Sequence, residues 1–451
     1  MIVKQNSSSQ DFIRKMTFER VTLNAPSTIV VSITRIQGPF PIKDVSQALH
    51  KLQLKHPLTR SKIMYDENDI AWFCDKKVPE IPCKIVPRES KTSWESYLRN
   101  EYQYPFEFSK GPLLRFIIIH SPQITEIIIF AHHTISDGIS LLYLQRDFLE
   151  FISNLNTPIN PINDLPIIEE KNLPITLKNK KILVKVANWL NSKWKQTKIR
   201  FSQEDYNELY SRFWQEPNNL THWSLTPLQS ERLIIWSKEH GLKVHSVLCT
   251  AFYAAQAKIE GQKTPYSTLI MPLSVRSRLK SPVGEVCGFY ATAAMFSVKY
   301  RFNLSFLENA KIFQKRIHHE MHKGDPFKTL KFGLIYPTLI DALYFQKFGL
   351  FNNKIARMLV KLLKWDQITT GMMISNLGKA PIPKQYGNLY IDCIYAPSII
   401  TSRHEKYLGI TTIGDQIHFI MTSRESMVSS DKVKQICEEA MIIIHNSYMF
   451  S

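Results

Sequence analysis

Two adjacent histidines, His132 and His133, end an apolar run that extends from Ile127 to Ala131. A neutral imidazole titrates near cellular pH, so it can take a proton from a hydroxyl or an amine that attacks a carbonyl. Because successive strand residues point to opposite faces, only one ring can face a given cavity, and the other is then structural. The same geometry argues against a shared metal ion, and we expect no metal site. Spacing alone leaves one alternative open, a histidine that only completes local hydrogen bonds at a strand end.

An Asp-Gly pair, Asp137 and Gly138, follows the histidines within the same short stretch. We expect Gly138 to permit a tight loop or a close approach of the backbone to another segment. Asp137 is expected either to orient a ring nitrogen or to fix the loop through a cation elsewhere in the chain. The histidines and this pair are the first candidates for a catalytic site.

The elements around this stretch place it between a buried strand and a helix. Residues 111–120 and 124–133 are two apolar, β-branched runs joined by a short turn, which predicts a hairpin with a buried second strand. Residues 140–155 return to helical spacing. Nearer the N-terminus, residues 28–36 are predicted to form a strand and residues 42–55 a helix. The histidines therefore lie on a strand-to-helix loop.

The chain is long enough for two domains, because 451 residues exceed the size at which one hydrophobic core keeps growing. Residues 156–180 contain four prolines and little periodicity, which is typical of a linker. We predict an N-terminal subdomain over residues 1–165, a crossover linker over 166–180 and a C-terminal subdomain over 181–451. Both parts contain strands and helices in similar proportion, so the predicted fold class is α/β (α+β).

Bulk composition limits the compartments and partners. The six cysteines form no C-x-x-C pair and no zinc-type group, which favours a reducing compartment without a structural metal. A polar N-terminus and the lack of an apolar stretch of about 20 residues predict a cytoplasmic protein. The net charge of +18 predicts acidic partners. Nucleic acid is not expected among them, because the basic residues are scattered and no nucleic-acid-binding motif is present.

The stretch from residue 132 to 138 matches an H-H-x-x-x-D-G signature and resembles the chloramphenicol acetyltransferase-like superfamily, which includes condensation domains and alcohol acyltransferases. Further segments resemble family segments in the expected order, and the resemblance extends from residue 19 to 445; these segments are residues 56–63, 111–116, 272–279, 286–292 and 375–378. The D-F-G-W-G segment of the plant branch is absent from the sequence. This places the chain nearer to bacterial alcohol acyltransferases and condensation-like members.

The resemblance implies two chloramphenicol acetyltransferase-like subdomains in a V-shaped pseudo-dimer, with an active-site tunnel at their interface. It implies that His133 is the general base, supported by His132 and Gly138. Asp137, the second candidate catalytic residue, would turn away from substrate and pair with Arg276, which holds the loop. A carboxylate behind an apolar strand needs such a cation, and Arg276 follows another apolar strand. A solvated surface arginine is the alternative.

Three other features are weaker candidates. Ser375 and Asn376 are candidates for an oxyanion or tunnel-wall role, with ordinary turn chemistry as the alternative. Residues 177–200 contain eight Lys or Arg residues and no acidic residue, at helical spacing, so they predict a basic amphipathic helix. This helix either contacts an anionic membrane or an acidic carrier protein, or packs its apolar side on the protein. His318 and His322 are predicted to lie on a solvated helical face.

The predicted function is transfer of an acyl group from a thioester of coenzyme A (CoA) or acyl carrier protein to an alcohol. The acceptor is expected to be a small molecule or lipid-like. The thioester is a co-substrate, and no permanently bound cofactor is expected. The sequence contains no carrier or adenylation module, so an acyl carrier protein, if it is the donor, is expected to be a separate chain that acts in trans. Two alternatives stay open: amide formation on carrier-bound substrates, and a catalytically silent carrier-binding module.

Overall fold

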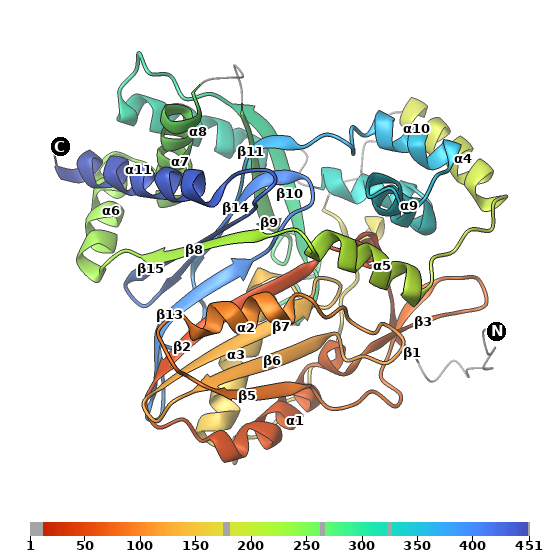
Figure 1. Ribbon diagram of the computed structural model, residues 1–451, viewed down its shortest axis with the longest axis horizontal. Coiled ribbons are helices and arrows are strands. Elements are labelled where there is room, and N and C mark those ends of the chain that lie inside the picture. The colour runs from red at the N-terminus through yellow and green to blue at the C-terminus, as the bar shows by residue number, and fades with distance from the viewer. Residues whose placement is uncertain (1–11, 175–180, 262–266, 323–326, 450–451) are drawn as a thin grey trace.

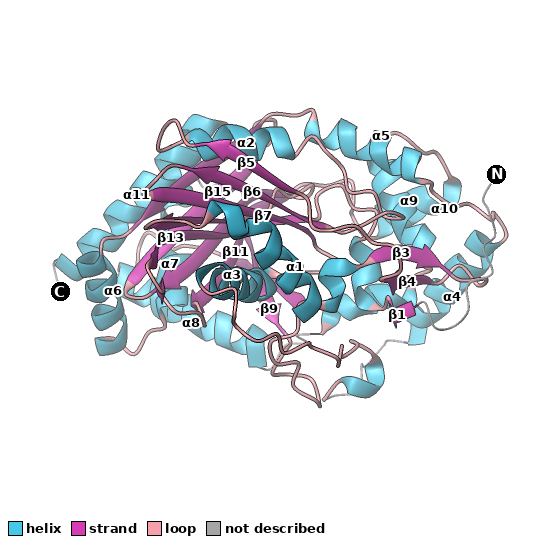
Figure 2. Ribbon diagram, turned by 90° about the horizontal axis from the view of Figure 1, so that it is seen from below, coloured by secondary structure: helices cyan, strands magenta, loops and turns pink. Residues whose placement is uncertain are grey.

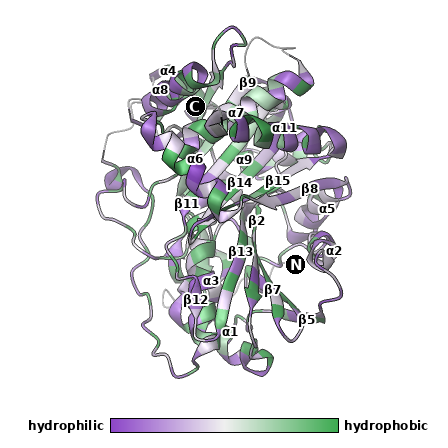
Figure 3. Ribbon diagram, turned by 90° about the vertical axis from the view of Figure 1, so that its left-hand side faces the viewer, coloured by the Kyte–Doolittle hydropathy of each residue, from purple (hydrophilic) through white to green (hydrophobic). Residues whose placement is uncertain are grey.

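The computed structural model describes residues 12–174, 181–261, 267–322 and 327–449 (Figure 1). Two six-stranded sheets form the centres of two lobes, and a small three-stranded sheet lies beside them. Figure 3 shows the lobes one above the other, with hydrophobic residues along the strands of both sheets. The predicted mixed α/β class with two lobes is confirmed.

The N-terminal sheet has the strand order β12-β13-β2-β7-β6-β5. Its strands are β2 (Ile29–Gln37), β5 (Cys83–Pro87), β6 (Leu114–His120), β7 (Ile124–His132), β12 (Gln385–Tyr386) and β13 (Leu389–Ser398). Strand β7 is buried from its second residue to its end and lies between β2 and β6, as its continuous apolar sequence predicts. Its last residue, His132, pairs with Ile29.

Three helices cover this sheet (Figure 2). Helices α1 (Val45–Lys55) and α3 (Gly138–Ser153) pack together on one face, and α2 (Ser93–Glu101) lies on the other. Helix α1 buries Val45, Leu49 and Leu52, the three residues whose spacing predicts it.

The C-terminal sheet has the order β10-β9-β11-β14-β15-β8. Its strands are β8 (Asn218–Ser224), β9 (Ser267–Ser274), β10 (Ala291–Val298), β11 (Thr369–Lys379), β14 (His404–Ile413) and β15 (Gln416–Arg424). The helices that pack on it are α6 (Pro227–Glu239), α7 (Val244–Glu260), α8 (Phe306–His322) and α11 (Ser430–Met449).

Strands β12 and β13 join the N-terminal sheet, although the sequence prediction assigns residues 181–451 to the C-terminal subdomain. Strand β13 pairs antiparallel with β2 and buries Ile391 and Ile394 in the N-terminal core. Helix α5 (Gln203–Trp214) also packs into that core. A single boundary at residue 181 therefore does not separate the two lobes, because local composition cannot reveal which sheet a distant strand will join.

A separate cluster of helices projects from the upper right of Figure 1. It consists of α4 (Lys181–Lys195), α9 (Pro337–Lys347) and α10 (Lys354–Leu362), whose buried side chains form one small core. Helix α4 corresponds to the predicted basic helix, whose residues 177–180 lie outside the described residues. The small sheet is built from β1 (Phe12–Lys15), β3 (Lys62–Tyr65) and β4 (Ala71–Cys74). None of the helices in the described ranges has the length and apolar character needed to span a bilayer.

Candidate active site

The histidines lie where strand β7 gives way to helix α3, as the sequence predicts. Strand β7 ends at His132, and α3 begins at Gly138, so residues 133–137 form the connecting loop. The loop backbone is fixed at its start, because the N–H of His132 donates to the Leu113 carbonyl and that of His133 to the Thr28 carbonyl. The two imidazole rings lie in different surroundings.

The His133 ring is oriented by the backbone of its own loop. Its Nδ1 lies 2.6 Å from the carbonyl oxygen of Ser136. A carbonyl only accepts, so Nδ1 carries the hydrogen and the lone pair of the neutral ring lies on Nε2. No hydrogen bond from a residue in the described ranges occupies Nε2. The ring also packs edge-to-face against Phe289, with the centroids 4.7 Å apart.

Burial lowers the pKa of His133 below its ordinary value. The hydrogen bond to Ser136 and the negative charge of Asp137 oppose this shift but do not cancel it. His133 is therefore neutral at cellular pH, which is the state in which a histidine can accept a proton.

His132 is fully buried and has partners on both ring nitrogens. Its Nδ1 lies 2.9 Å from the Thr134 hydroxyl, and its Nε2 lies 3.3 Å from the Thr28 hydroxyl. Phe106 and Phe108 meet the ring edge-to-face. Burial lowers the pKa of His132 to about 3. The ring is a neutral packing element, in line with the structural place predicted for it.

Asp137 turns away from His133 and caps helix α3. Its carboxylate accepts hydrogen bonds from the backbone N–H of Ser140 at 2.7 Å, from the Ser140 hydroxyl at 2.8 Å and from the backbone N–H of Tyr290 at 3.0 Å. Arg276 lies 3.2 Å from the same carboxylate. Burial by itself favours the neutral acid, but the Arg276 charge and these donors outweigh it, so the pKa of Asp137 lies below its ordinary value.

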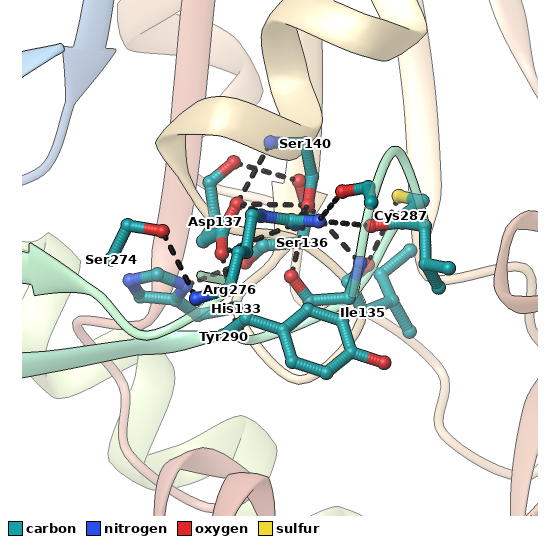
Figure 4. A network of polar contacts seen from close by, with 12 residues as sticks. His133, Ile135, Ser136, Asp137, Ser140, Ser274, Arg276, Cys287 and Tyr290 are labelled. Atoms are coloured by element: carbon teal, nitrogen blue, oxygen red, sulfur yellow. Dashed lines mark hydrogen bonds and ion pairs between the residues drawn. The ribbon is translucent and has the colours of Figure 1, made fainter. Parts of the chain in front are cut away.

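Arg276 is buried and has a polar or aromatic contact on nearly every side (Figure 4). One terminal nitrogen donates to Asp137 and to the Ser140 hydroxyl, and the other donates to the carbonyls of Gly284 and Val286. Its guanidinium carbon lies 4.9 Å from the centre of the Tyr290 ring. The alternative of a solvated surface arginine is wrong, because the hairpin-like return of residues 276–290 encloses the side chain.

Gly138 is needed for space. A Cβ at this position would lie 2.9 Å from Cδ2 of Leu377 and 3.2 Å from Cγ of Pro397. The close approach predicted for this glycine is therefore made to side chains of β11 and β13. This contact brings the start of α3 against segments that come about 240 to 260 residues later in the chain.

Ser375 and Asn376 lie within strand β11, whose pairing with β14 is irregular between Asn376 and Lys379. Ser375 is buried and pairs with Gly409 of β14. The side-chain oxygen of Asn376 accepts a hydrogen bond from the N–H of Gly378 at 2.8 Å. Within the described ranges, no hydrogen bond joins either residue to His133, and their oxyanion role stays a prediction.

A cavity of about 1010 Å³ lies in the C-terminal lobe. It reaches Leu377, the residue that meets Gly138, so it comes up to the start of α3. The ionisable side chains of its described lining are all basic, among apolar neighbours; they are Lys243, Arg278, Lys311, Lys315, His240, His245, His318 and His322. Burial lowers the pKa of His245 to about 4, so this ring adds no charge at cellular pH. No carboxylate belongs to the lining formed by the described residues. The described lining runs from residue 240 to 378 and does not include His133, so a tunnel through the interface stays a prediction.

Sequence reasoning missed several contributors to this site. Ser140 bridges Asp137, Arg276 and the backbone of Gly288, and its spacing of three residues from Asp137 is the usual signal of an N-cap. Phe289 and Tyr290 fall in a segment singled out only by resemblance. The cationic cavity has no local signal, because its charges come from three separate segments.

Comparisons with known proteins place these observations among related chains. Residues 14–166, which contain the histidine loop, match the model of the condensation domain family. Cyclosporin synthetase simA of Tolypocladium inflatum is 24% identical over 336 residues, which is 70% of this chain and 2% of the synthetase. The chain spans only about 2 to 3% of the length of the curated relatives it matches.

Solved structures share the fold over nearly the whole chain. The TRI3 trichothecene 15-O-acetyltransferase from Fusarium sporotrichioides has a TM-score of 0.66 at 12% identity and covers 99% of this chain and 97% of its own. The first condensation domain of the CDA synthetase has a TM-score of 0.63 at 10% identity, with 98% of this chain and 97% of its own covered. At these identities the likeness shows the fold alone.

Proposed function

Because this chain has the chloramphenicol acetyltransferase-like fold of condensation domains and acyltransferases, we propose that it transfers an acyl group from a thioester to an alcohol, with His133 as general base. Nε2 of His133 removes the hydroxyl proton as the acceptor oxygen attacks the thioester carbonyl. The C–S bond then breaks, the ester forms, and the imidazolium returns its proton to the departing thiolate. No covalent acyl-enzyme is needed in this scheme.

The observation that carries the proposal is the 2.6 Å contact between Nδ1 of His133 and the Ser136 carbonyl oxygen. The Ser136 carbonyl holds the hydrogen on Nδ1, so Nε2 presents its lone pair without any change in the loop. The lowered pKa keeps that lone pair available at cellular pH. Positioned proton transfer of this kind contributes about 10²- to 10⁴-fold to a rate.

The cationic cavity supports a donor that carries phosphate. Arg278 and the three lysines of the cavity have no ion pair with any residue in the described ranges, so their charge is available to an anion. The phosphates of CoA, or the phosphodiester of a phosphopantetheine arm, supply such an anion. The same cavity reaches Leu377, which meets Gly138 at the start of α3.

A carrier-bound donor acting in trans is the second candidate. The matches to cyclosporin synthetase and to a hybrid PKS-NRPS synthetase of Trichoderma harzianum favour it, because both are named as synthetases. We further propose a reducing, cytoplasmic setting, which the six free cysteine thiols support.

The direct test incubates purified protein with acyl-CoA donors of several chain lengths and a panel of alcohols and amines. Free thiol release together with an ester mass supports the proposal, and an amide mass redirects it to condensation chemistry. His133→Ala is expected to lower turnover by about 10²- to 10⁴-fold. Equal turnover of the parent and His133→Ala overturns the general-base assignment. No turnover with any CoA or carrier donor overturns the enzymatic function.

The phosphate-binding role of the cavity is tested with two donors that have the same acyl group, an acyl-CoA and an acyl-pantetheine without phosphates. We expect Lys311→Gln/Lys315→Gln to raise the KM for acyl-CoA and to leave the KM for acyl-pantetheine unchanged. Lys432→Gln, on the exposed side of α11, is the matched control. An equal effect on both donors contradicts phosphate recognition at this cavity.

A further inference from the structure

Helix α4 has apolar side chains on two sides. Leu190 and Trp194 point inward and are only 1% exposed, within the core shared with α9 and α10. On another side, Ile182, Val186 and Trp189 follow one another at helical spacing and are 68%, 36% and 50% exposed. Packing on the protein therefore explains one apolar side of α4 and leaves the other in contact with water.

The neighbouring helix α10 repeats this arrangement. Leu359 and Val360 belong to the shared core. Met358 and Leu362, one helical turn apart, are 40% and 57% exposed. Two packed helices thus both present large apolar side chains outward, on the part of the molecule that projects from the body in Figure 1. Single exposed apolar residues are ordinary on protein surfaces, but adjoining groups of them mark an interaction site.

The charges beside these side chains all have one sign. Neither α4 nor α10 contains an Asp or Glu residue. Their basic residues are Lys181, Lys185, Lys193 and Lys195 on α4 and Lys354, Arg357 and Lys361 on α10. No ion pair links any of these seven to an acidic residue within the described ranges. The surface therefore combines exposed apolar side chains with uncompensated positive charge.

We propose that the outward sides of α4 and α10, here called the α4–α10 surface, bind an anionic membrane surface. Helices at a membrane interface place Trp, Leu and Ile side chains among the lipid head groups and acyl chains, while their lysines reach the anionic phosphates. The tryptophan at position 189 suits this boundary because its ring is apolar and its N–H can still meet water. A folded acidic partner satisfies the lysines but requires a matching apolar hollow, whereas a bilayer accepts apolar side chains of any outline. The inference is independent of the proposed acyl transfer.

The experiment is flotation of the full chain with vesicles of phosphatidylcholine alone or with added phosphatidylglycerol. We expect binding to the anionic vesicles only. Ile182→Ser/Trp189→Ser is expected to weaken that binding at least about tenfold, because two apolar side chains no longer enter the interface. Lys185→Gln and Lys193→Gln are expected to weaken it about fivefold each, and added salt to weaken it further.

Matched controls come from exposed residues of other helices. Ile234→Ser on α6 and Lys434→Gln on α11 remove an exposed apolar side chain and an exposed lysine without touching the α4–α10 surface. They are expected to bind vesicles like the parent, and circular dichroism is expected to show that all variants fold. Absence of parent binding to anionic vesicles, or equal loss in the controls, overturns the proposal. Binding of a purified acidic carrier protein instead of vesicles, lost in the same α4 variants, also overturns it and identifies a protein-docking surface.

Discussion

The Arg276 guanidinium lies 3.2 Å from the Asp137 carboxylate, across 139 residues of sequence. Asp137 caps the first helix after the histidine loop, and Arg276 lies in the loop that follows β9 of the other lobe. The ion pair therefore fastens the histidine loop to the C-terminal lobe. The carboxylate accepts three other hydrogen bonds as well, which fix its position. It therefore orients the arginine and has no oxygen left free to bind substrate.

Breaking this buried pair is expected to destabilise the protein. Asp137→Asn keeps the helix cap but removes the charge, and Arg276→Met removes its partner. Each is expected to lower the free energy of unfolding by about 3–5 kcal/mol, because one buried charge is left uncompensated. The double variant is expected to lose less than the sum of the two, which denaturant unfolding of all four proteins measures. Strict additivity contradicts a direct interaction.

The pH dependence of turnover reports on His133. Because its pKa lies below the ordinary value of 6.5, the ring stays neutral as the pH falls below neutrality, and the acid limb of the rate profile is expected below pH 6.5. The Asp137 charge raises the pKa of His133, so Asp137→Asn is expected to move this limb to lower pH. Thiol release from acyl-CoA between pH 4.5 and 8 measures both profiles. An acid limb that Asp137→Asn leaves in place argues against His133 as the titrating base.

Folding stability is expected to fall in acid because of buried histidines. The pKa of His132 is lowered to about 3 and that of His418 to about 4, and both side chains are nearly inaccessible to water. The pKa of a histidine in the unfolded chain is about 6.5. Below this pH the unfolded chain binds protons at these two positions and the folded chain does not, so each histidine lowers the free energy of unfolding by up to about 1.4 kcal/mol per pH unit. Above pH 6.5 neither contributes.

Denaturant unfolding at pH 7, 6 and 5 measures this slope. His132→Asn and His418→Asn are each expected to make it shallower, whatever they do to stability at pH 7. His50→Gln, whose parent side chain is 54% exposed, is the control and is expected to leave the slope unchanged. If neither His132→Asn nor His418→Asn changes the slope, these two histidines are not its cause.

Adding a methyl group at position 138 is expected to disturb the contact between the lobes. In Gly138→Ala the new Cβ would lie 2.9 Å from Leu377, so the neighbouring side chains must move, at a cost of about 1–3 kcal/mol. Leu377→Ala makes room for this methyl group. The double variant is therefore expected to recover much of the stability that Gly138→Ala loses, as measured by thermal unfolding. If the double variant regains no stability, the strain lies at the contact with Pro397 and not at Leu377.

The sequence predicted the local parts of this architecture well. Strand β7 and helix α3 follow from an apolar run and a helical repeat. The contact of Asp137 with Arg276 was expected through resemblance and from the need of a buried carboxylate for a cation. Each of these features is encoded by residues close together in sequence or by a simple charge requirement.

Features formed by distant segments were not predictable in the same way. The cationic cavity collects Lys243, Arg278 and Lys311 from three separate elements, and nothing in any one of them signals the others. The sequence of helix α4 shows apolar and basic residues, but only the tertiary contacts separate Leu190 from the exposed Trp189. Both depend on how the lobes and the helical cluster pack.

The crossing of β13 into the N-terminal sheet has a consequence for how the chain is made. Strand β2 has β7 on one side and β13 on the other, so until residue 398 leaves the ribosome one edge of β2 is unpaired. An exposed, apolar strand edge invites pairing with other chains. Fragments that end near residue 166 are therefore poor candidates for expression, and the first lobe is completed only when synthesis of the second is almost finished.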